Sequence, residues 1–387
     1  MNGNAKILTA LVGYEALGTP IEKESLFLSD EALARVYEIA NKHDLAHLVS
    51  AALDRLGAFP EGELGEKIRR SQMLAVQRCV LIDHEYSRIC KALNEGKICF
   101  IPLKGSIIKN LYRERWHRTS CDIDILVKEN NLDEAIQLLC DTLGYKTDGV
   151  KNFHDISLRS KSGVHLELHF NIKENLDYLD VCLDRVWDYA KPVTEGGYQY
   201  KLSAEFFMYH LFAHLTNHFV RGGCGVRPFL DICVLKEKAV YDEEKLRELL
   251  RVSGIERFCD AACRLAEIWF MSEEPDDLSA ELERYVLCGG AYGSIENRVS
   301  VNREKEGGKF KYIIKRIFMP YKSLKLLYPI LNKHKWLLPI CWVRRWFRIL
   351  FNGRLKSSVS ELKAINYVSD DKVKSVDSLF RRLELNK

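Results

Sequence analysis

Apolar residues recur every three to four positions through the first part of the chain, which is the spacing of one buried helix face. Ser29 can cap the first strong pattern, and Asp44 begins a second pattern that ends at Gly57. A long third pattern covers about residues 63–93. We therefore expect an N-terminal helical region over residues 1–95.

After Lys97 the pattern changes to short runs of β-branched and aromatic residues, separated by turns and by shorter helical patterns. The predicted elements are strands at 98–103, 121–127, 153–159 and 164–170 and helices at 107–112 and 132–143. The Lys161-Ser-Gly163 link between the last two strands predicts a hairpin. The resulting β-α-β-α-β-β order predicts a compact mixed sheet over residues 96–190.

Helical periodicity returns after Pro192, with its strongest pattern over residues 205–219. Pro320, Pro329 and Pro339 divide the last part of the chain into several short helices. The predicted fold class is α+β, with a small mixed-sheet core flanked by N- and C-terminal helical regions. The expected divisions of the chain are 1–95, 96–190, 191–300 and 301–387.

The composition is that of a folded globular protein, with 47% hydrophobic and 29% charged residues, which excludes disordered and low-complexity classes. The 12 cysteines include no C-x-x-C pair, so we expect reduced, mostly buried thiols in a cytoplasmic protein. The net charge of +4 conceals an asymmetry. Residues 309–356 contain 13 Lys and Arg and no acidic residue, so the remaining residues together carry −9.

Two aspartates alternate with apolar residues in the second predicted strand. Because side chains two apart share a face, Asp122 and Asp124 point to one side of the strand, and Ile123 and Ile125 point to the other. Glu167 holds a similar place in the fourth predicted strand. If these strands pair, the carboxylates meet, and two such charges ~4 Å apart repel by about 4 kcal/mol at an effective dielectric of 20. The pattern therefore predicts a divalent cation, Mg²⁺ above all.

The Lys104-Gly105-Ser106 segment lies where the first predicted strand ends and a helix begins. A helix start offers unpaired backbone N–H groups and the positive end of the helix dipole, which suit a phosphate. The glycine allows close backbone approach, and Ser106 adds a hydroxyl. The segment is therefore a candidate phosphate-binding turn.

Two further polar features have open interpretations. Arg118 is placed to contact a phosphate, or to form a structural ion pair with Asp122 or Glu114. Three residues spaced four apart share one face of the helix predicted at 205–219, namely His210, His214 and His218. We favour a buried polar seam for these histidines over a metal site, because no carboxylate or cysteine ligand can be placed beside them.

Together these pieces resemble the polymerase-beta-type nucleotidyltransferase superfamily, whose pattern is a strand, Gly-[Gly/Ser], a helix, an Asp-h-[Asp/Glu]-h strand (h is apolar) and a later acidic residue. The chain is most similar to the branch of uncharacterised nucleotidyltransferases, over about residues 25–350. The segments that carry the resemblance are 103–105, Tyr112, Arg118, 122–127, 166–169, 209–214 and 229–231. One departure is that 15 residues separate Ser106 from Asp122, more than the usual superfamily spacing.

The resemblance implies transfer of a nucleoside monophosphate from a nucleoside triphosphate to an acceptor hydroxyl, with release of pyrophosphate. It implies that the catalytic and metal-binding residues are Asp122, Asp124 and Glu167, with Mg²⁺ or Mn²⁺ as the ion. It also implies that the nucleotide-binding residues are Lys104, Gly105, Ser106 and Arg118. The acceptor is left open: a small molecule, a sugar, a protein or an RNA end.

The basic segment, residues 309–356, interleaves Lys and Arg with aromatic residues and has three open interpretations. It is a set of helices docked on the acidic body, a peripheral contact with a membrane surface, or a contact with a nucleic-acid backbone. The alternative to an enzyme is therefore a catalytically silent adaptor on the same fold. Such an adaptor would dock at the inner membrane surface or on a partner through residues 309–356.

Overall fold

The structure is a computed structural model that describes residues 3–21, 29–351 and 355–386. Residues 1–2 and 22–28 of the predicted N-terminal region, residues 352–354 of the basic segment, and residue 387 lie outside the described residues.

The N-terminal region is helical, as predicted. Its helices are α1 (Gly3–Leu17), α2 (Asp30–Lys42), α3 (Ala46–Leu56) and α4 (Gly62–Glu95). The Ser29 hydroxyl accepts the backbone N–H of Ala32 and caps α2. Gly57, at a φ of 65°, ends α3 in the left-handed conformation that glycine tolerates.

A five-stranded mixed sheet follows, in the spatial order β1-β2-β5-β4-β3. The strands are β1 (Phe100–Pro102), β2 (Asp122–Val127), β3 (Lys146–Lys151), β4 (Asp155–Arg159) and β5 (His165–His169). Strands β4 and β5 form the predicted antiparallel hairpin, and β2 runs parallel to β5. Strand β3 was not predicted. The α+β class is confirmed.

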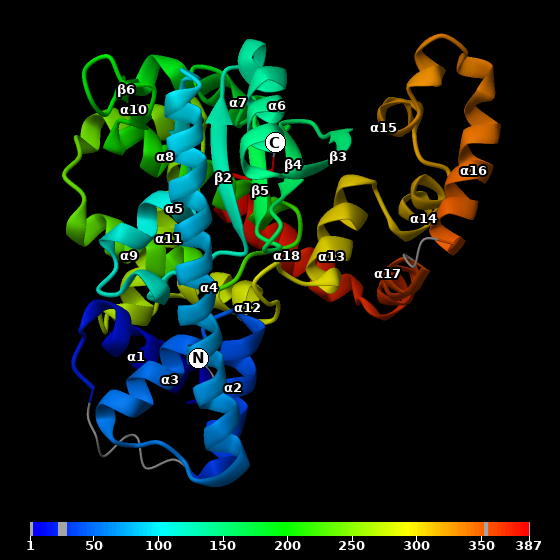
Figure 1. The fold of residues 1–387 in the computed structure, drawn as a ribbon. Helices are drawn as coiled ribbons and strands as arrows, with labels where there is room; N and C mark the ends of the chain where they lie inside the picture. Colours follow the sequence, from blue (N-terminus) through cyan, green and yellow to red (C-terminus); the bar gives the residue numbers. More distant parts are fainter. Residues whose placement is uncertain (1–2, 22–28, 352–354, 387) are drawn as a thin grey trace.

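The apolar face of the sheet is covered by α4 and by α6 (Leu132–Leu143), which lie side by side across it (Figure 1). Ile123 and Ile125 of β2 belong to a buried cluster that also contains Ile89 of α4 and Leu139 of α6. Because side chains alternate along a strand, this packing turns Asp122 and Asp124 to the opposite face.

The opposite side of the molecule is built mainly from helices, including α8, whose range matches the predicted 205–219. The elements after β5 are α7 (Asp177–Leu183), β6 (Ala190–Pro192), β7 (Tyr200–Leu202), α8 (Ala204–Val220), α9 (Arg227–Lys238), α10 (Glu243–Val252), α11 (Glu256–Phe270), α12 (Asp277–Leu287) and α13 (Ile295–Lys305). One hydrophobic core joins these helices to α1–α3 and to β1. This core crosses the predicted boundaries at residues 95 and 190. The four-part division of the chain stays a prediction.

The C-terminal elements include α14 (Lys309–Ile317), α15 (Tyr321–Leu327), α16 (Leu338–Phe351), α17 (Leu355–Tyr367) and α18 (Asp370–Arg382). Helices α14–α17 project from the rest of the molecule, whereas α18 returns to the main body (Figure 1). Two buried clusters hold the projecting part: one around Tyr312 and Ile365, which also includes Val299 of α13 and Val373 of α18, and one around Leu324 and Leu331. Among the helices that the structure describes, none has the length and apolar content needed to cross a membrane.

Candidate active site

Strands β2 and β5 bring the three predicted carboxylates together. Asp124 is directly opposite Glu167 in the parallel register, and Asp122 is directly opposite His165. Asp124 is buried, while Asp122 and Glu167 are partly exposed. The alternation of each strand and the pairing of the two strands therefore place all three acids on the face that α4 and α6 leave uncovered.

Two overlapping groups of side chains on these strands have the spacing of a metal site. One consists of Asp122, His165 and Glu167, and the other of Asp124, Glu167 and His169; within each group the possible ligand atoms lie within 4.8 Å of one another. Both groups share Glu167. Carboxylate oxygens are the ligands that Mg²⁺ and Mn²⁺ prefer, and each group offers two carboxylates beside one histidine. The donor set fits the predicted cation.

Asp124 is held by two cationic or hydrogen-bonding neighbours. The Lys104 amine lies 3.1 Å from Asp124 Oδ1, and His169 Nε2 donates to the same oxygen at 2.9 Å. Burial acts to raise the pKa of Asp124, but Lys104 and His169 outweigh it and hold the pKa well below the usual range. Burial likewise acts to lower the pKa of Lys104, and the carboxylates of Asp124, Glu174 and Glu167 raise it above its ordinary value. Both groups are therefore charged at neutral pH.

The backbone at Lys104 is strained, with a φ of 41° and a ψ of −115°. Non-glycine residues rarely adopt a positive φ, and such strain is typical of functional turns. The Leu103 N–H donates to the Asp124 carbonyl at 3.0 Å, so β1 delivers Lys104 directly to the carboxylate side chain. Lys104 is thus a partly buried member of the site, with its side chain 19% exposed.

The predicted phosphate-binding turn is only partly present. Gly105 lines the cavity described below, next to Lys104. It begins a single four-residue turn, α5 (Gly105–Ile108), in place of the predicted helix at 107–112, and the 3₁₀ turns η2 (Lys109–Leu111) and η3 (Arg115–His117) fill much of the long interval before β2. Ser106 is buried and is not among the residues that line the cavity. Its phosphate role stays a prediction.

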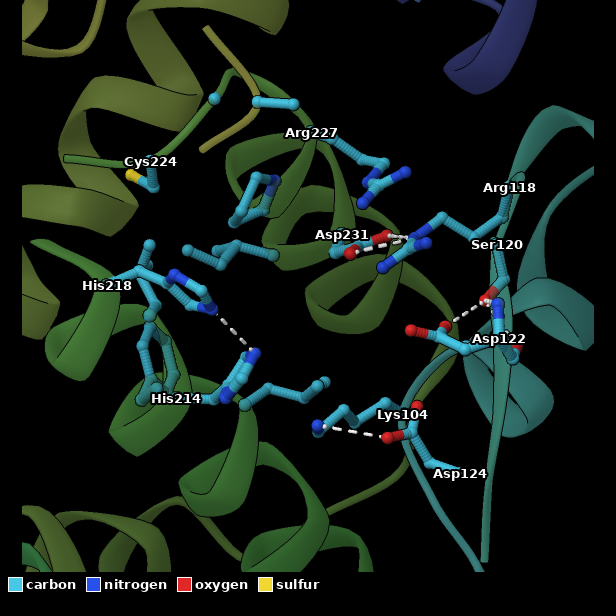
Figure 2. A pocket seen from close by; sticks show the side chains of 18 of the residues that line it. Lys104, Arg118, Ser120, Asp122, Asp124, His214, His218, Cys224, Arg227 and Asp231 are labelled. Atoms are coloured by element: carbon cyan, nitrogen blue, oxygen red, sulfur yellow. Dashed lines mark hydrogen bonds and ion pairs between the residues drawn. The ribbon is translucent and has the colours of Figure 1, made fainter. Parts of the chain in front are cut away.

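Ser120 is a site residue that the sequence reasoning missed. Its hydroxyl lies 2.8 Å from Asp122 Oδ1 and 2.7 Å from the Asp122 carbonyl, and its side chain lines the cavity (Figure 2). A serine two residues before an Asp-x-Asp strand is the available signal, because a short polar side chain there can turn back onto the aspartate. Ser120, unlike Ser106, therefore orients a predicted metal ligand.

Arg118 forms an ion pair with a partner that was not predicted. Its Nε donates to Asp231 at 2.7 Å, not to Asp122 or Glu114, and both side chains are largely buried. Tyr112 donates its hydroxyl to the same carboxylate at 2.6 Å. Three residues that carried the family resemblance, far apart in the sequence, thus meet at one point beside the carboxylates.

A cavity of about 350 Å³ opens over these groups (Figure 2). Its polar wall comes from the sheet side and includes Lys104, Gly105, Arg118, Ser120, Asp122, Asp124 and Glu167. Its apolar wall comes mainly from α8 and α9 and includes Met208, Leu211, Phe212, Leu215, Ile232 and Leu235. A cavity with one ionic and one apolar wall suits a substrate that has both a charged and an uncharged part.

Two of the three α8 histidines, His214 and His218, line this cavity. His214 Nδ1 donates to Glu174 Oε1 at 2.7 Å, and His214 Nε2 lies 3.0 Å from His218 Nε2 (Figure 2). His210 is fully buried, and burial lowers its pKa to about 3. Among the described residues, neither group with metal-site spacing contains any of these histidines. The contacts with Glu174 join α8 to the chain that follows β5.

The carboxylate cluster has more negative charge than Lys104 offsets. Burial raises the pKa of Glu167, and the neighbouring Asp124 and Asp122 raise it further, to about 7. A carboxyl with so high a pKa gains from a cation or a proton. This electrostatic crowding is the physical reason to expect a metal ion.

A family model described as uncharacterised nucleotidyltransferase matches residues 29–271. The chain belongs to this family. The match includes all of the sheet, the cavity walls from α8 and α9, and every predicted site residue. No curated protein and no solved structure matches the chain.

The raised pKa of Glu167 predicts a pH-dependent stability for the metal-free protein. The folded protein binds the Glu167 proton more tightly than the unfolded chain, so the stability from this group is full below about pH 4.5 and is lost as the pH rises through about 7. We expect the unfolding free energy of wild type, relative to Glu167→Gln, to fall by about 2 kcal/mol between pH 5 and 8. Urea unfolding in EDTA measures it.

The exposed Glu134→Gln variant is the matched control, because its pH profile should follow that of wild type. Adding Mg²⁺ should stabilise wild type more at pH 8 than at pH 5, since the ion competes with the proton for Glu167. Equal pH profiles for wild type and Glu167→Gln would show that the carboxylates are not crowded.

Proposed function

We propose that this nucleotidyltransferase transfers a nucleoside monophosphate from a nucleoside triphosphate to an acceptor hydroxyl. The acceptor oxygen forms a bond to the α-phosphorus, the bond from that phosphorus to the bridging oxygen breaks, and pyrophosphate leaves. The observation that carries the proposal is the convergence of Asp122, Asp124 and Glu167 from β2 and β5 on one cavity.

The three carboxylates would hold Mg²⁺ or Mn²⁺. The bound ions would supply charge neutralisation for the triphosphate and would lower the pKa of the acceptor hydroxyl. Asp124 is kept ionised for this role by Lys104 and His169, and Ser120 fixes the orientation of Asp122. In an alternative assignment, Glu167 serves as the general base for the acceptor proton.

Lys104 and Arg118 are the cationic side chains proposed to meet the phosphates. The Lys104 amine contacts Asp124 and lines the cavity, so its charge lies beside the carboxylates that the triphosphate must approach. The Arg118 Nε and Nη1 groups are engaged by Asp231 and by the Thr119 carbonyl, which fixes the guanidinium at the cavity wall. Fixed cations stabilise charge that develops on departing pyrophosphate. Gly105 and Ser106 complete the proposed nucleotide-binding set.

The apolar wall on α8 and α9 is proposed to receive the uncharged part of a substrate. Because it faces the ionic wall across one cavity, a molecule with a phosphate end and a planar or aliphatic end would satisfy both. The acceptor class stays open among small molecules, sugars, proteins and RNA ends.

The test is an assay of the purified protein with each of four α-labelled nucleoside triphosphates, Mg²⁺ or Mn²⁺, and a cell extract. We expect pyrophosphate release together with label on an acceptor fraction, and no label when EDTA is present. Absence of transfer with every nucleotide and both metals would contradict the proposal.

A second candidate is a catalytically silent adaptor on the same fold, favoured by the exposed apolar and basic surface of the projecting helices α14–α16. The two candidates differ in one measurement. Tight nucleotide binding with no transfer to any fraction would support the adaptor, and labelled product would support the enzyme.

A further inference from the structure

Helix α14 leaves one apolar face uncovered. Phe310, Ile314 and Ile317 are 73%, 42% and 39% exposed, and their spacing places them on one side of the helix. Tyr312, on another side, is buried in the cluster with Ile365, and its hydroxyl donates to Glu361. The helix is thus fixed by its inner side while its apolar stripe faces outward.

Helix α16 likewise has one exposed apolar side and one side that packs inward. Ile340, Val343 and Phe347 are 58%, 44% and 55% exposed and also share one side of their helix. The inner side is held by two indoles: Trp342 Nε1 donates to the Met319 carbonyl at 2.8 Å, and Trp346 Nε1 donates to the Ile317 carbonyl at 3.0 Å. The exposed stripe is therefore the outward face of a well-anchored helix.

Lys and Arg residues of this segment are adjacent in the sequence to the exposed apolar residues. Arg344 and Arg348 directly follow Val343 and Phe347 in α16, and Lys309 and Lys311 flank Phe310 in α14. Among the Lys and Arg residues of this segment that the structure describes, Lys315 pairs with Glu306 and Arg316 pairs with Glu361. The other bases lack an acidic counterpart within this segment, because residues 309–356 contain no Asp or Glu.

Within the described part of the chain, Glu306 and Glu361 are the acidic residues that pair with this segment, and its other Lys and Arg side chains have no such partner. The projecting helices pack on two buried clusters, one of which also contains Val299 of α13 and Val373 of α18, and they stand apart from the sheet and α8–α12 (Figure 1). An outside partner must then be anionic, to match the bases, and must accept aliphatic side chains such as Ile314, Ile340 and Val343. A nucleic acid meets the first requirement. It offers no apolar environment for aliphatic groups, because its phosphates bind Lys and Arg and its nucleobases stack on aromatic side chains.

We propose that α14–α16 form a docking surface for an anionic lipid bilayer. The apolar stripes and Trp336, which is 72% exposed, enter the interface between headgroups and acyl chains, while the Lys and Arg side chains contact lipid phosphates and carboxylates. This peripheral contact does not depend on the proposed reaction. It would bring the nucleotidyltransferase to a two-dimensional surface without a membrane-spanning helix.

Flotation of the full chain with vesicles tests the proposal. One vesicle set contains 30% phosphatidylserine in phosphatidylcholine, and the other contains phosphatidylcholine alone. We expect binding to the first set at 50 mM NaCl, at least about tenfold weaker binding to the second, and weaker binding at 500 mM NaCl.

Two surface variants with matched controls separate the two parts of the contact. Phe310→Ser with Ile314→Ser should weaken vesicle binding about tenfold or more, whereas Val240→Ser, at a site 96% exposed on the main body, should leave it unchanged. Lys309→Glu with Lys311→Glu should have a similar or larger effect and Lys201→Glu little effect. Circular dichroism melting of each variant verifies its fold.

Three outcomes would overturn the proposal. The first is absence of binding to phosphatidylserine vesicles at low salt. The second is tighter binding to a 30-nucleotide RNA than to the vesicles, with both lost together in the lysine variant and neither affected by the serine variant. The third is self-association in analytical ultracentrifugation that the serine variant abolishes, since the stripes would then cover one another between two copies.

Discussion

An Asp122→Asn variant is expected to lose nucleotidyl transfer by about a thousandfold while it keeps a stability within about 1 kcal/mol of wild type. Asparagine preserves the shape of the side chain and the oxygen that faces the Ser120 hydroxyl. It removes one of the charges of the proposed metal site. Because Asp122 is partly exposed and pairs with no cation in the structure's described part, no buried charge is left behind.

The measurement is transfer of label from an α-labelled nucleoside triphosphate, together with a Mn²⁺ titration followed by electron paramagnetic resonance. Asp141→Asn is the matched control, because Asp141 is exposed on α6, on the far side of the sheet from the cavity. We expect the control to transfer and to bind Mn²⁺ as wild type does. Wild-type transfer by Asp122→Asn would remove this carboxylate from the reaction.

The central part of this site is predictable because strand alternation is a local rule. A two-residue period in β2 and β5 fixes which side chains share a face, and parallel pairing then brings Asp124 opposite Glu167. The geometry of the candidate metal site therefore follows from two short sequence patterns and one pairing. The hairpin of β4 and β5, which positions Glu167, is local in the same way.

Other contacts depend on chain segments whose meeting no local pattern specifies. The Arg118 partner, Asp231, is 113 residues away, and the ion pair exists because α9 packs against the start of the sheet region. Strand β3 was missed because Lys146–Lys151 contains a glycine and little apolar alternation; pairing with β4 at the sheet edge stabilises it. Such elements are determined by their neighbours in space.

The basic segment shows the same limit at the surface. Its prolines predict several short helices, and α14 and α15 have 9 and 7 residues, whereas α16 has 14. The sequence does not show which apolar side chains of these helices are buried and which are exposed. Trp342 and Trp346 turn inward and bond to backbone carbonyls, whereas Phe347 is 55% exposed. The distinction between a docked and an exposed segment needed the tertiary contacts.

The ion pair between Arg118 and Asp231 yields the largest expected effect on stability. An Asp231→Leu variant should lose about 3–5 kcal/mol of unfolding free energy, because it leaves a buried guanidinium without its counter-charge. The side chains of Arg118 and Asp231 are 11% and 8% exposed, so water cannot replace the carboxylate. Urea unfolding of the full chain measures the loss.

The double variant Arg118→Met with Asp231→Leu separates structure from function at this pair. It removes both charges and should recover most of the lost stability, since a buried ion pair can be replaced by apolar groups at little cost. The remaining deficit should be about 1–2 kcal/mol, because the Tyr112 hydroxyl loses its acceptor. Equal stability of Asp231→Leu and the double variant would show that the pair is not coupled.

Transfer activity of the same double variant then tests the proposed role of Arg118. If the guanidinium only braces α9 against the sheet, a stable double variant should transfer label at close to the wild-type rate. If Arg118 also contacts the nucleotide phosphates, the double variant should be folded and still at least about a hundredfold slower, with a raised KM for the nucleotide. We expect the second result, because Arg118 lines the cavity beside Asp122 and Ser120 as well as pairing with Asp231.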